Sequence, residues 1–357
     1  MAIVRVNHPA LVRGYIDEMK VGDHELAVRG WMVQPHRPLS AFQAHLDGSL
    51  AGALEPLPRE DVAKAFPWIS HTRQSGFEFR LPISARRGRI DIVGLRGHRP
   101  VARLTSLYRT DLGSAIATPP ATLMVRALGN ASPDFYRADG LKSFSEFSDA
   151  ASRHRELVSI RRMLDWGCGC GRVTVQFLLD GTIPEVFGCD IDGEAIAWCQ
   201  QHLREGKFQR IEPYPPTPYP DQSFDLVIAY SVFTHLSRDL QNAWLTEMRR
   251  IISPGGLFIA SVHGPFATSF AFPPTGLGRF VPRLRDRFIR HTILREGIVD
   301  TTVDHALNGV APEGYYRGVF QTREHTMKAW SKFFEILEYA EGGVGNFQDL
   351  VVMRRPA

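Results

Sequence analysis

Hydrophobic and polar residues alternate along much of the first 105 residues, in short runs that turn signals separate. Alternation with a period of two is typical of β-strands that bury one face. The clearest runs are Glu25–Val33 (ELAVRGWMV), Ala41–Leu46, Gly76–Ile83 (GFEFRLPI) and Arg89–Leu95. The second run is followed by Asp47-Gly48, a strong hairpin signal. We therefore expect residues 1–105 to form an all-β, sandwich-like module.

The pattern changes beyond this module. Residues 106–140 contain Pro119-Pro120 and scattered glycines without stable alternation, and we interpret them as a linker and leading segment. From 141 to 357, strand-like apolar runs alternate with helical stretches, which predicts a mainly parallel sheet with helices on both faces. Residues 264–321 are too many for a simple strand-to-helix connection, so we expect a lid-like insertion there.

Composition places the chain among soluble globular proteins. Its 357 residues are 44% hydrophobic and 22% charged, which excludes disordered and fibrous classes and leaves room for two domains. No apolar run approaches the ~20 residues that cross a bilayer, and no signal core precedes the first charges. We expect a cytoplasmic protein. The net charge of +4 is small for this length and predicts no nucleic-acid partner.

The four cysteines fall within residues 168–199, whereas a secreted scaffold spreads its pairs over many loops. Cys168 and Cys170 form a C-x-C pair inside a glycine-rich turn. No second pair follows at the spacing of a zinc site, so we predict reduced thiols and no metal.

The glycine-rich turn is the most informative stretch of the chain. In Met163–Phe177 (MLDWGCGCGRVTVQF), a short apolar strand leads through Gly167, Gly169 and Gly171 into a helical run. Glycines let the backbone approach a ligand closely. The dinucleotide-binding fingerprint requires a glycine where this chain has Arg172, which weakens a dehydrogenase interpretation. Asp190 ends the next strand-like run, where a carboxylate is suited to accept hydrogen bonds from ribose hydroxyls.

Four stretches in order resemble the motifs of class I S-adenosylmethionine-dependent methyltransferases. They are Leu164–Arg172, VFGCDID at 186–192, FDLVIAYSVFTHL at 224–236 and ISPGGLFIASVHG at 252–264. The ending FEILEYAEGGVGNFQDLVVMRR is similar to the closing antiparallel hairpin of this family. The resemblance implies a Rossmann-like, mainly parallel seven-stranded sheet, S-adenosylmethionine as cofactor, and a methyltransferase activity.

The same resemblance implies the roles of individual residues. Asp165 would hold the amino group of the cofactor, Asp190 the ribose hydroxyls and Ile191 the adenine ring, while Tyr230 and Ser231 would meet the methionine end through their backbone. The cofactor-binding residues that we expect are therefore Asp165, Gly167, Cys168, Gly169, Gly171, Asp190, Ile191, Tyr230 and Ser231. The partner of the adenine amine stays unassigned.

Two histidines follow the fourth and fifth expected strands of this domain, where the fold places substrates. A hydroxyl acceptor requires a general base, so we expect His235 or His263 to be catalytic. The alternatives are a helix-start residue at His235 and a plain turn residue at His263. Tyr315, Tyr316 and Arg317 are suited by their aromatic and cationic character to contact a sugar or aromatic substrate.

Within the insertion, four arginines recur at helical spacing and would share one face. They are Arg279, Arg283, Arg287 and Arg290. Such a face attracts an acidic acceptor, although a solvated basic surface fits the pattern equally.

The N-terminal half resembles, more loosely, β-sandwich modules that accompany bacterial glycosyltransferases, through the stretch from Gly14 by way of RGWMV to GFEFRLPI. This resemblance implies O-methylation of a glycan or glycosylated precursor. The alternatives are a small-molecule natural-product methyltransferase and a non-catalytic cofactor-binding scaffold. The sequence leaves the oligomeric state open, and a homo-oligomer is one alternative.

Overall fold

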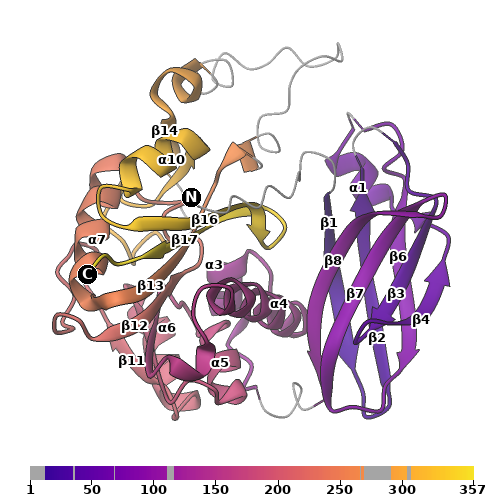
Figure 1. Cartoon of the computed structure of the whole chain (residues 1–357), viewed down its shortest axis with the longest axis horizontal. Coiled ribbons are helices and arrows are strands. Elements are labelled where there is room, and N and C mark those ends of the chain that lie inside the picture. The colour runs from indigo at the N-terminus through magenta and orange to yellow at the C-terminus, as the bar shows by residue number, and fades with distance from the viewer. Residues whose placement is uncertain are drawn as a thin grey trace. The chain divides into compact units, whose positions relative to one another are not determined.

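The computed structural model describes residues 13–34, 37–67, 69–110, 116–265, 267–268, 291–303 and 307–357 (Figure 1). These residues form two compact units. One contains the described residues up to 121 together with 130–145, and the other contains 122–129 and the described residues from 146 onward. The domain boundaries that composition indicates at residues 105 and 140 stay predictions.

The N-terminal unit consists of two antiparallel four-stranded sheets. Their strand orders are β1-β2-β6-β5 and β4-β3-β7-β8. The strands are β1 (Arg13–Val21), β2 (Glu25–Val33), β3 (Ala41–Leu46), β4 (Ser49–Leu54), β5 (Leu57–Pro58), β6 (Gln74–Pro82), β7 (Arg87–Arg96) and β8 (Arg99–Arg109), and a short helix, α1 (Glu60–Ala65), lies between β5 and β6.

The two sheets pack face to face, as the alternation along the strands predicts. Phe42 of β3 and Phe77 of β6 are both buried, and their ring centroids lie 5.4 Å apart across the space between the sheets. Asp47 and Gly48 both have positive φ and connect β3 to β4 as a two-residue hairpin turn. The expectation of an all-β, sandwich-like module is confirmed.

The C-terminal unit is built on a seven-stranded sheet of order β11-β10-β9-β12-β13-β17-β16. The first five strands in this order are parallel, and β17 is antiparallel to both of its neighbours. The strands are β9 (Arg162–Trp166), β10 (Glu185–Asp190), β11 (Lys207–Arg210), β12 (Phe224–Ala229), β13 (Ile252–Val262), β16 (Glu335–Val344) and β17 (Gln348–Arg354). The Rossmann-like sheet and its closing hairpin agree with the sequence expectation.

Helices connect most of the strands and cover the sheet. They are α5 (Thr174–Asp180), α6 (Gly193–His202), α7 (Arg238–Ile251) and α10 (Arg323–Trp330), with a short 3₁₀ helix, η2 (Leu157–Ser159), before β9. Trp244 of α7 and Trp330 of α10 are fully buried. Trp244 packs at a tilt against Trp166, and Trp330 against Phe233, with ring centroids 4.7 and 4.6 Å apart. None of the helices in the described ranges is both long and apolar enough to span a bilayer.

The direction of the chain through this sheet creates a binding edge. From β9 the chain proceeds outward to β10 and β11, then returns to the other side of β9 as β12. Ligands of open α/β sheets bind at the carboxyl ends of the strands beside such a reversal. The residues that follow β9, β10 and β12 are therefore the first candidates for a site.

Two helices precede the sheet, α3 (Ala121–Leu128) and α4 (Pro133–Ser152). Leu123 and Met124 of α3 are buried. Residues 122–129 belong to the C-terminal unit although the residues on either side of them belong to the other unit. The segment that we expected to be a linker thus contains a helix of the C-terminal unit.

The predicted insertion is described in part. Within it, β14 (Ile298–Val303) pairs with β15 (Arg317–Gln321) as an antiparallel two-stranded sheet. The backbone of β15 also binds the turn after β12, because Arg317 N donates to His235 O at 3.2 Å and Val319 N to Thr234 O at 2.8 Å. The four arginines of the expected basic face lie outside the described residues.

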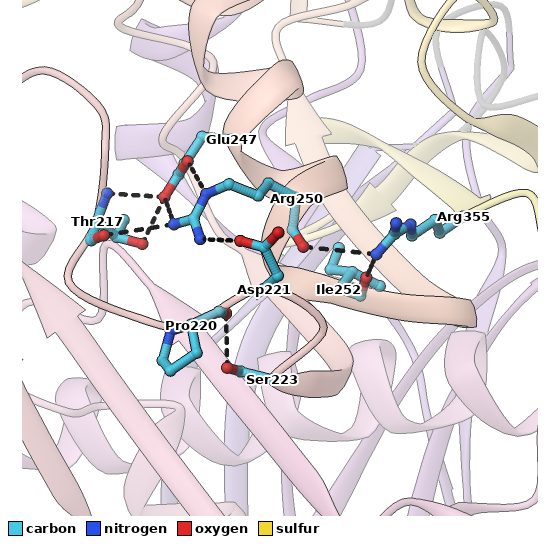
Figure 2. A network of polar contacts seen from close by, with 8 residues as sticks. All are labelled: Thr217, Pro220, Asp221, Ser223, Glu247, Arg250, Ile252 and Arg355. Atoms are coloured by element: carbon cyan, nitrogen blue, oxygen red, sulfur yellow. Dashed lines mark hydrogen bonds and ion pairs between the residues drawn. The ribbon is translucent and has the colours of Figure 1, made fainter.

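An ion pair between the buried carboxylate of Glu247 and the half-buried Arg250 holds the proline-rich loop between β11 and β12 against α7 (Figure 2). Glu247 accepts hydrogen bonds from the backbone N and the hydroxyl of Thr217, at 2.7 and 2.6 Å. Arg250 donates to the same carboxylate at 2.6 and 2.9 Å and to Asp221 at 2.7 Å. Burial opposes ionisation of Glu247, but the hydrogen bonds from Arg250 and Thr217 outweigh it and lower the pKa of this carboxyl.

We expect Glu247→Gln to lower the free energy of unfolding by about 2 kcal/mol, because it removes a buried charge-assisted acceptor from two partners. A lowered pKa in the folded state stabilises at neutral pH, and this contribution is lost as pH falls through the folded value. Urea unfolding should therefore show the two proteins converging below about pH 4. Asp221→Ala is the control, because its side chain is 71% exposed and its loss should cost about 0.5 kcal/mol or less. A difference that persists at low pH would contradict the assignment.

Candidate cofactor and substrate site

The turn after β9 is shaped by glycines in left-handed conformations. Gly167, Gly169 and Gly171 have φ of +78°, +53° and +75°. A Cβ atom at Gly167 would lie 2.4 Å from Cγ2 of Val232, so a side chain does not fit there. The turn is fastened to the end of β10, since Gly167 N donates to Cys189 O at 2.8 Å. The backbone of this turn therefore forms a fixed wall at the binding edge.

Asp190 ends β10 and connects this turn to the next helix. One of its carboxylate oxygens accepts a hydrogen bond from Gly169 N at 2.8 Å, and the other accepts one from Asp192 N at 2.9 Å. Burial raises the pKa of Asp190, while these backbone hydrogen bonds oppose the rise. A carboxylate oxygen accepts more than one hydrogen bond, so both oxygens keep capacity for donors of a ligand.

Asp165 lies near the carboxyl end of β9 and is buried, with 2% of its surface exposed. The hydroxyl of Thr174, at the start of α5, donates to its carboxylate at 2.6 Å. Burial raises the pKa of Asp165 to about 7, although the hydrogen bond from Thr174 lowers it. This carboxyl is therefore poised between its neutral and ionised forms near neutral pH.

These groups line one cavity of about 400 Å³ within the C-terminal unit. Of the expected cofactor-binding residues, Gly171 does not line it. The others do: Asp165, Gly167, Cys168, Gly169, Asp190, Ile191, Tyr230 and Ser231. Their roles toward a ligand stay predictions. Among the residues that the structure describes, no group of three His, Cys, Asp or Glu side chains is placed to hold a metal ion.

One wall of the cavity comes from α3, which the sequence analysis missed. Leu123, Arg126 and Ala127 of this helix line the cavity. Arg126 forms ion pairs with Asp192, the N-cap of α6, and with Glu194 at 3.1 Å. The signal that could have indicated this helix is the uninterrupted run ATLMVRAL directly after Pro119-Pro120.

His235 lines the cavity at the turn after β12. Its Nδ1 lies 2.9 Å from the carbonyl oxygen of Arg317, and its ring stacks on Tyr316 with centroids 3.8 Å apart. A carbonyl oxygen only accepts, so Nδ1 carries the hydrogen and Nε2 of the neutral ring keeps its lone pair. This is the tautomer that can accept a proton at Nε2.

His263 does not line the cavity. Its ring stacks on Phe320 of β15 at 4.9 Å between centroids and lies 6.3 Å from the ring of His235. Its Nδ1 is enclosed without a hydrogen-bond partner. Burial and the neighbouring His235 lower the pKa of His263 to about 3. The placement differs from our expectation because β15 lies against this end of β13, where Gln321 N donates to His263 O.

The expected substrate-binding residues are divided in the same way. Tyr315 and Tyr316 line the cavity, and Arg317 does not. The hydroxyl of Tyr315 donates to the carbonyl of Pro213 in the proline-rich loop, and burial raises the pKa of Tyr315 to about 12. Arg317 instead forms an ion pair with Asp300 of β14, with 3.6 Å between Nη1 of Arg317 and Oδ2 of Asp300.

Comparison with known proteins identifies the domain. Residues 164–260 match the family described as "Methyltransferase domain". An uncharacterized methyltransferase of Schizosaccharomyces pombe is 31% identical over 105 residues, which is 27% of this chain and 37% of that protein. A probable methyltransferase of Aspergillus luteorubrus is 28% identical over 106 residues, with the same shares covered. The chain thus spans little more than a third of the length of these relatives.

Solved structures give a weaker likeness. A protein of Pyrococcus horikoshii is 19% identical with a TM-score of 0.42, covering 60% of this chain and 89% of its own. An S-adenosylmethionine-dependent methyltransferase from Mesorhizobium loti is 18% identical with a TM-score of 0.42, covering 58% and 96%. At these scores the fold assignment depends on the strand order of the sheet. The family match places a methyltransferase domain in residues 164–260, and the strand order agrees with the Rossmann-like sheet that the sequence resemblance implies. The resemblance seen in the sequence is confirmed for this domain.

Proposed function

We propose that the chain binds S-adenosylmethionine in the cavity and transfers its methyl group to a hydroxyl. The observation that carries this proposal is the joint placement of Asp190 and the glycine turn at the carboxyl ends of β9 and β10. Asp190 offers two oriented carboxylate oxygens to the ribose hydroxyls, and the glycine backbone admits the ligand closely. Apolar Ile191 and Ile211 line the same cavity and suit the adenine ring. The residues present therefore fit this cofactor.

When bound, S-adenosylmethionine would supply a methyl group from its sulfonium sulfur and would leave as the thioether S-adenosylhomocysteine. The task of the protein is to position the acceptor and to take its proton. His235 lines the cavity, and its Nδ1 is held on the carbonyl of Arg317. Nε2 of His235 would take the proton of the acceptor hydroxyl as the methyl group passes from sulfur to oxygen. The same carbonyl then stabilises the imidazolium through Nδ1–H.

We propose a glycan or glycosylated precursor as the acceptor. Tyr316 and Tyr315 contribute aromatic surface to the cavity, which suits stacking on a sugar ring. The all-β unit gives further support through its sequence resemblance to modules that accompany glycosyltransferases. All four cysteines are buried and lie outside disulfides, which is consistent with the cytoplasmic location that we propose.

The experiment that tests this function follows the transfer of a labelled methyl group from S-adenosylmethionine to a panel of acceptors. Hydroxyl-bearing oligosaccharides and their activated precursors form one arm, and phenolic small molecules form the other. Methylation of the saccharide arm would support the proposal. Methylation of the phenols alone would assign the chain to small-molecule chemistry. Binding of S-adenosylhomocysteine without turnover of any acceptor would favour a scaffold.

The raised pKa of Asp165 predicts a pH-dependent affinity. Only the ionised carboxylate attracts the ammonium group of S-adenosylhomocysteine, and Asp165 ionises as pH rises through about 7. We expect calorimetry between about pH 6 and pH 8 to show affinity rising with pH, by up to about tenfold per unit below the pKa. Asp165→Asn should bind more weakly and lose this dependence. The same slope in the variant would exclude Asp165 as its source.

A further inference from the structure

We infer that Gln348 is a positioning residue for this site, because together with Ser261 it holds Ser231 in a strained backbone conformation at the cavity wall. The inference rests on the proposed function, since it concerns how the turn that carries His235 is kept in place.

Ser231 is the second residue after β12, and its φ is +61°. This left-handed conformation is uncommon for residues other than glycine, asparagine and aspartate. Such conformations persist only where the surrounding structure holds them, and they are concentrated at functional sites. The residues around Ser231 must therefore supply the contacts that hold it in this conformation.

A ring of hydrogen bonds surrounds Ser231, and the donor and acceptor of each bond can be assigned. Ser231 N donates to Oγ of Ser261 at 2.7 Å. The hydroxyl of Ser261 donates to Oε1 of Gln348 at 2.7 Å, and Nε2 of Gln348 donates to Oγ of Ser231 at 2.9 Å. Thr234 uses its only hydroxyl hydrogen on Ser231 O, so the hydroxyl of Ser231 donates to Thr234 at 2.9 Å.

This ring occupies the donor capacity of Ser231. Its backbone N–H and its hydroxyl hydrogen are both donated within the protein, to Ser261 and Thr234. The hydroxyl of Ser231 therefore binds only within the protein, and it has no hydrogen left to donate to a substrate. A leucine or methionine at 348 could not replace these two hydrogen bonds, because neither side chain carries a strong acceptor for Ser261 or a donor for Ser231.

The turn that this ring holds joins two parts of the cavity wall. Val232, directly after Ser231, packs against Gly167 of the glycine turn, where an added Cβ would meet it at 2.4 Å. His235 N donates to Val232 O at 3.0 Å, which closes the turn at its other end. A shift of Ser231 would thus move the wall beside the glycine turn and the imidazole together. Gln348, which opens β17, controls this shift from 117 positions further along the chain.

The test is a comparison of Ser231→Ala with Ser231→Gly. Both variants lose the hydroxyl, but only glycine adopts the left-handed conformation without strain. We expect Ser231→Gly to melt about 2–4 °C above Ser231→Ala and to bind S-adenosylhomocysteine about fivefold more tightly. Equal melting temperatures and equal affinities would overturn the inference. If the wild-type chain does not bind S-adenosylhomocysteine, the proposed function fails, while the melting temperatures still test the strained turn.

A double-mutant cycle then assigns the holding role to Gln348. In the wild-type background, Gln348→Met should lower turnover by about tenfold while the affinity for S-adenosylhomocysteine changes by less than about threefold. In the Ser231→Gly background the same substitution should cause little further loss of turnover, because no strained residue remains to be held. A residue that only stabilises the hairpin would lower the melting temperature and turnover equally in both backgrounds, and that result would overturn the assignment. Ser261→Ala replaces Gln348→Met if the latter does not fold.

Discussion

Asp190→Ala is expected to weaken binding of S-adenosylhomocysteine by tenfold or more while the chain stays folded. Asp190 would accept two charge-assisted hydrogen bonds from the ribose, each contributing ~1.5–3 kcal/mol. The substitution also removes the acceptor of Gly169 N and Asp192 N, so the glycine turn loses its tie to the start of α6. Both effects act in the same direction on affinity.

Isothermal titration calorimetry measures this loss directly, and far-ultraviolet circular dichroism reports whether the fold is kept. Asp221→Ala serves as the control, because it removes an exposed carboxylate outside the cavity and should leave the affinity within about twofold. An unchanged affinity in Asp190→Ala would remove this residue from the site.

Replacing His235 by asparagine should lower turnover by about 10²–10⁴, the usual contribution of a positioned general base. Asparagine is the informative substitution because its side-chain amide can still donate to the carbonyl of Arg317, as Nδ1 of His235 does. It carries no group at the place of Nε2 that could accept the proton. The affinity for S-adenosylhomocysteine should change little, since the loss concerns the chemical step.

His263→Gln is the matched comparison for this experiment. The ring of His263 lies behind that of His235 and outside the cavity lining, so its replacement should reduce turnover far less. A large loss in His263→Gln alone would place the base at the end of β13. If both variants keep their activity, the acceptor is acidic enough to react through proximity and orientation alone.

Local patterns predict much of this site. The glycine spacing, Asp165 and Asp190 are encoded within single strand–turn segments, and the structure brings them into one cavity. The Asp47-Gly48 hairpin and the closing hairpin of the sheet follow from equally local signals. In each case the residues that determine the geometry are close in sequence.

The features that sequence analysis missed depend on contacts between distant segments. Periodicity correctly places His263 at the end of β13, but it carries no information that β15 lies against this residue. The stacking of Tyr316 on His235 and the hydrogen bond from Gln348 to Ser231 join residues 81 and 117 positions apart. No local pattern encodes such pairings, which form only when the insertion and the C-terminal hairpin pack on the sheet.

The membership of α3 in the C-terminal unit has a consequence for biosynthesis. In the described residues the chain passes between the two units at 121/122, 129/130 and 145/146. A ribosome therefore delivers α3 before the sheet with which it lines the cavity. The N-terminal unit gains its last residues only after that helix has emerged. Neither unit is a continuous stretch of translated chain. A single cut in the gene would leave one of them incomplete, so recombination would exchange the two units together more readily than apart.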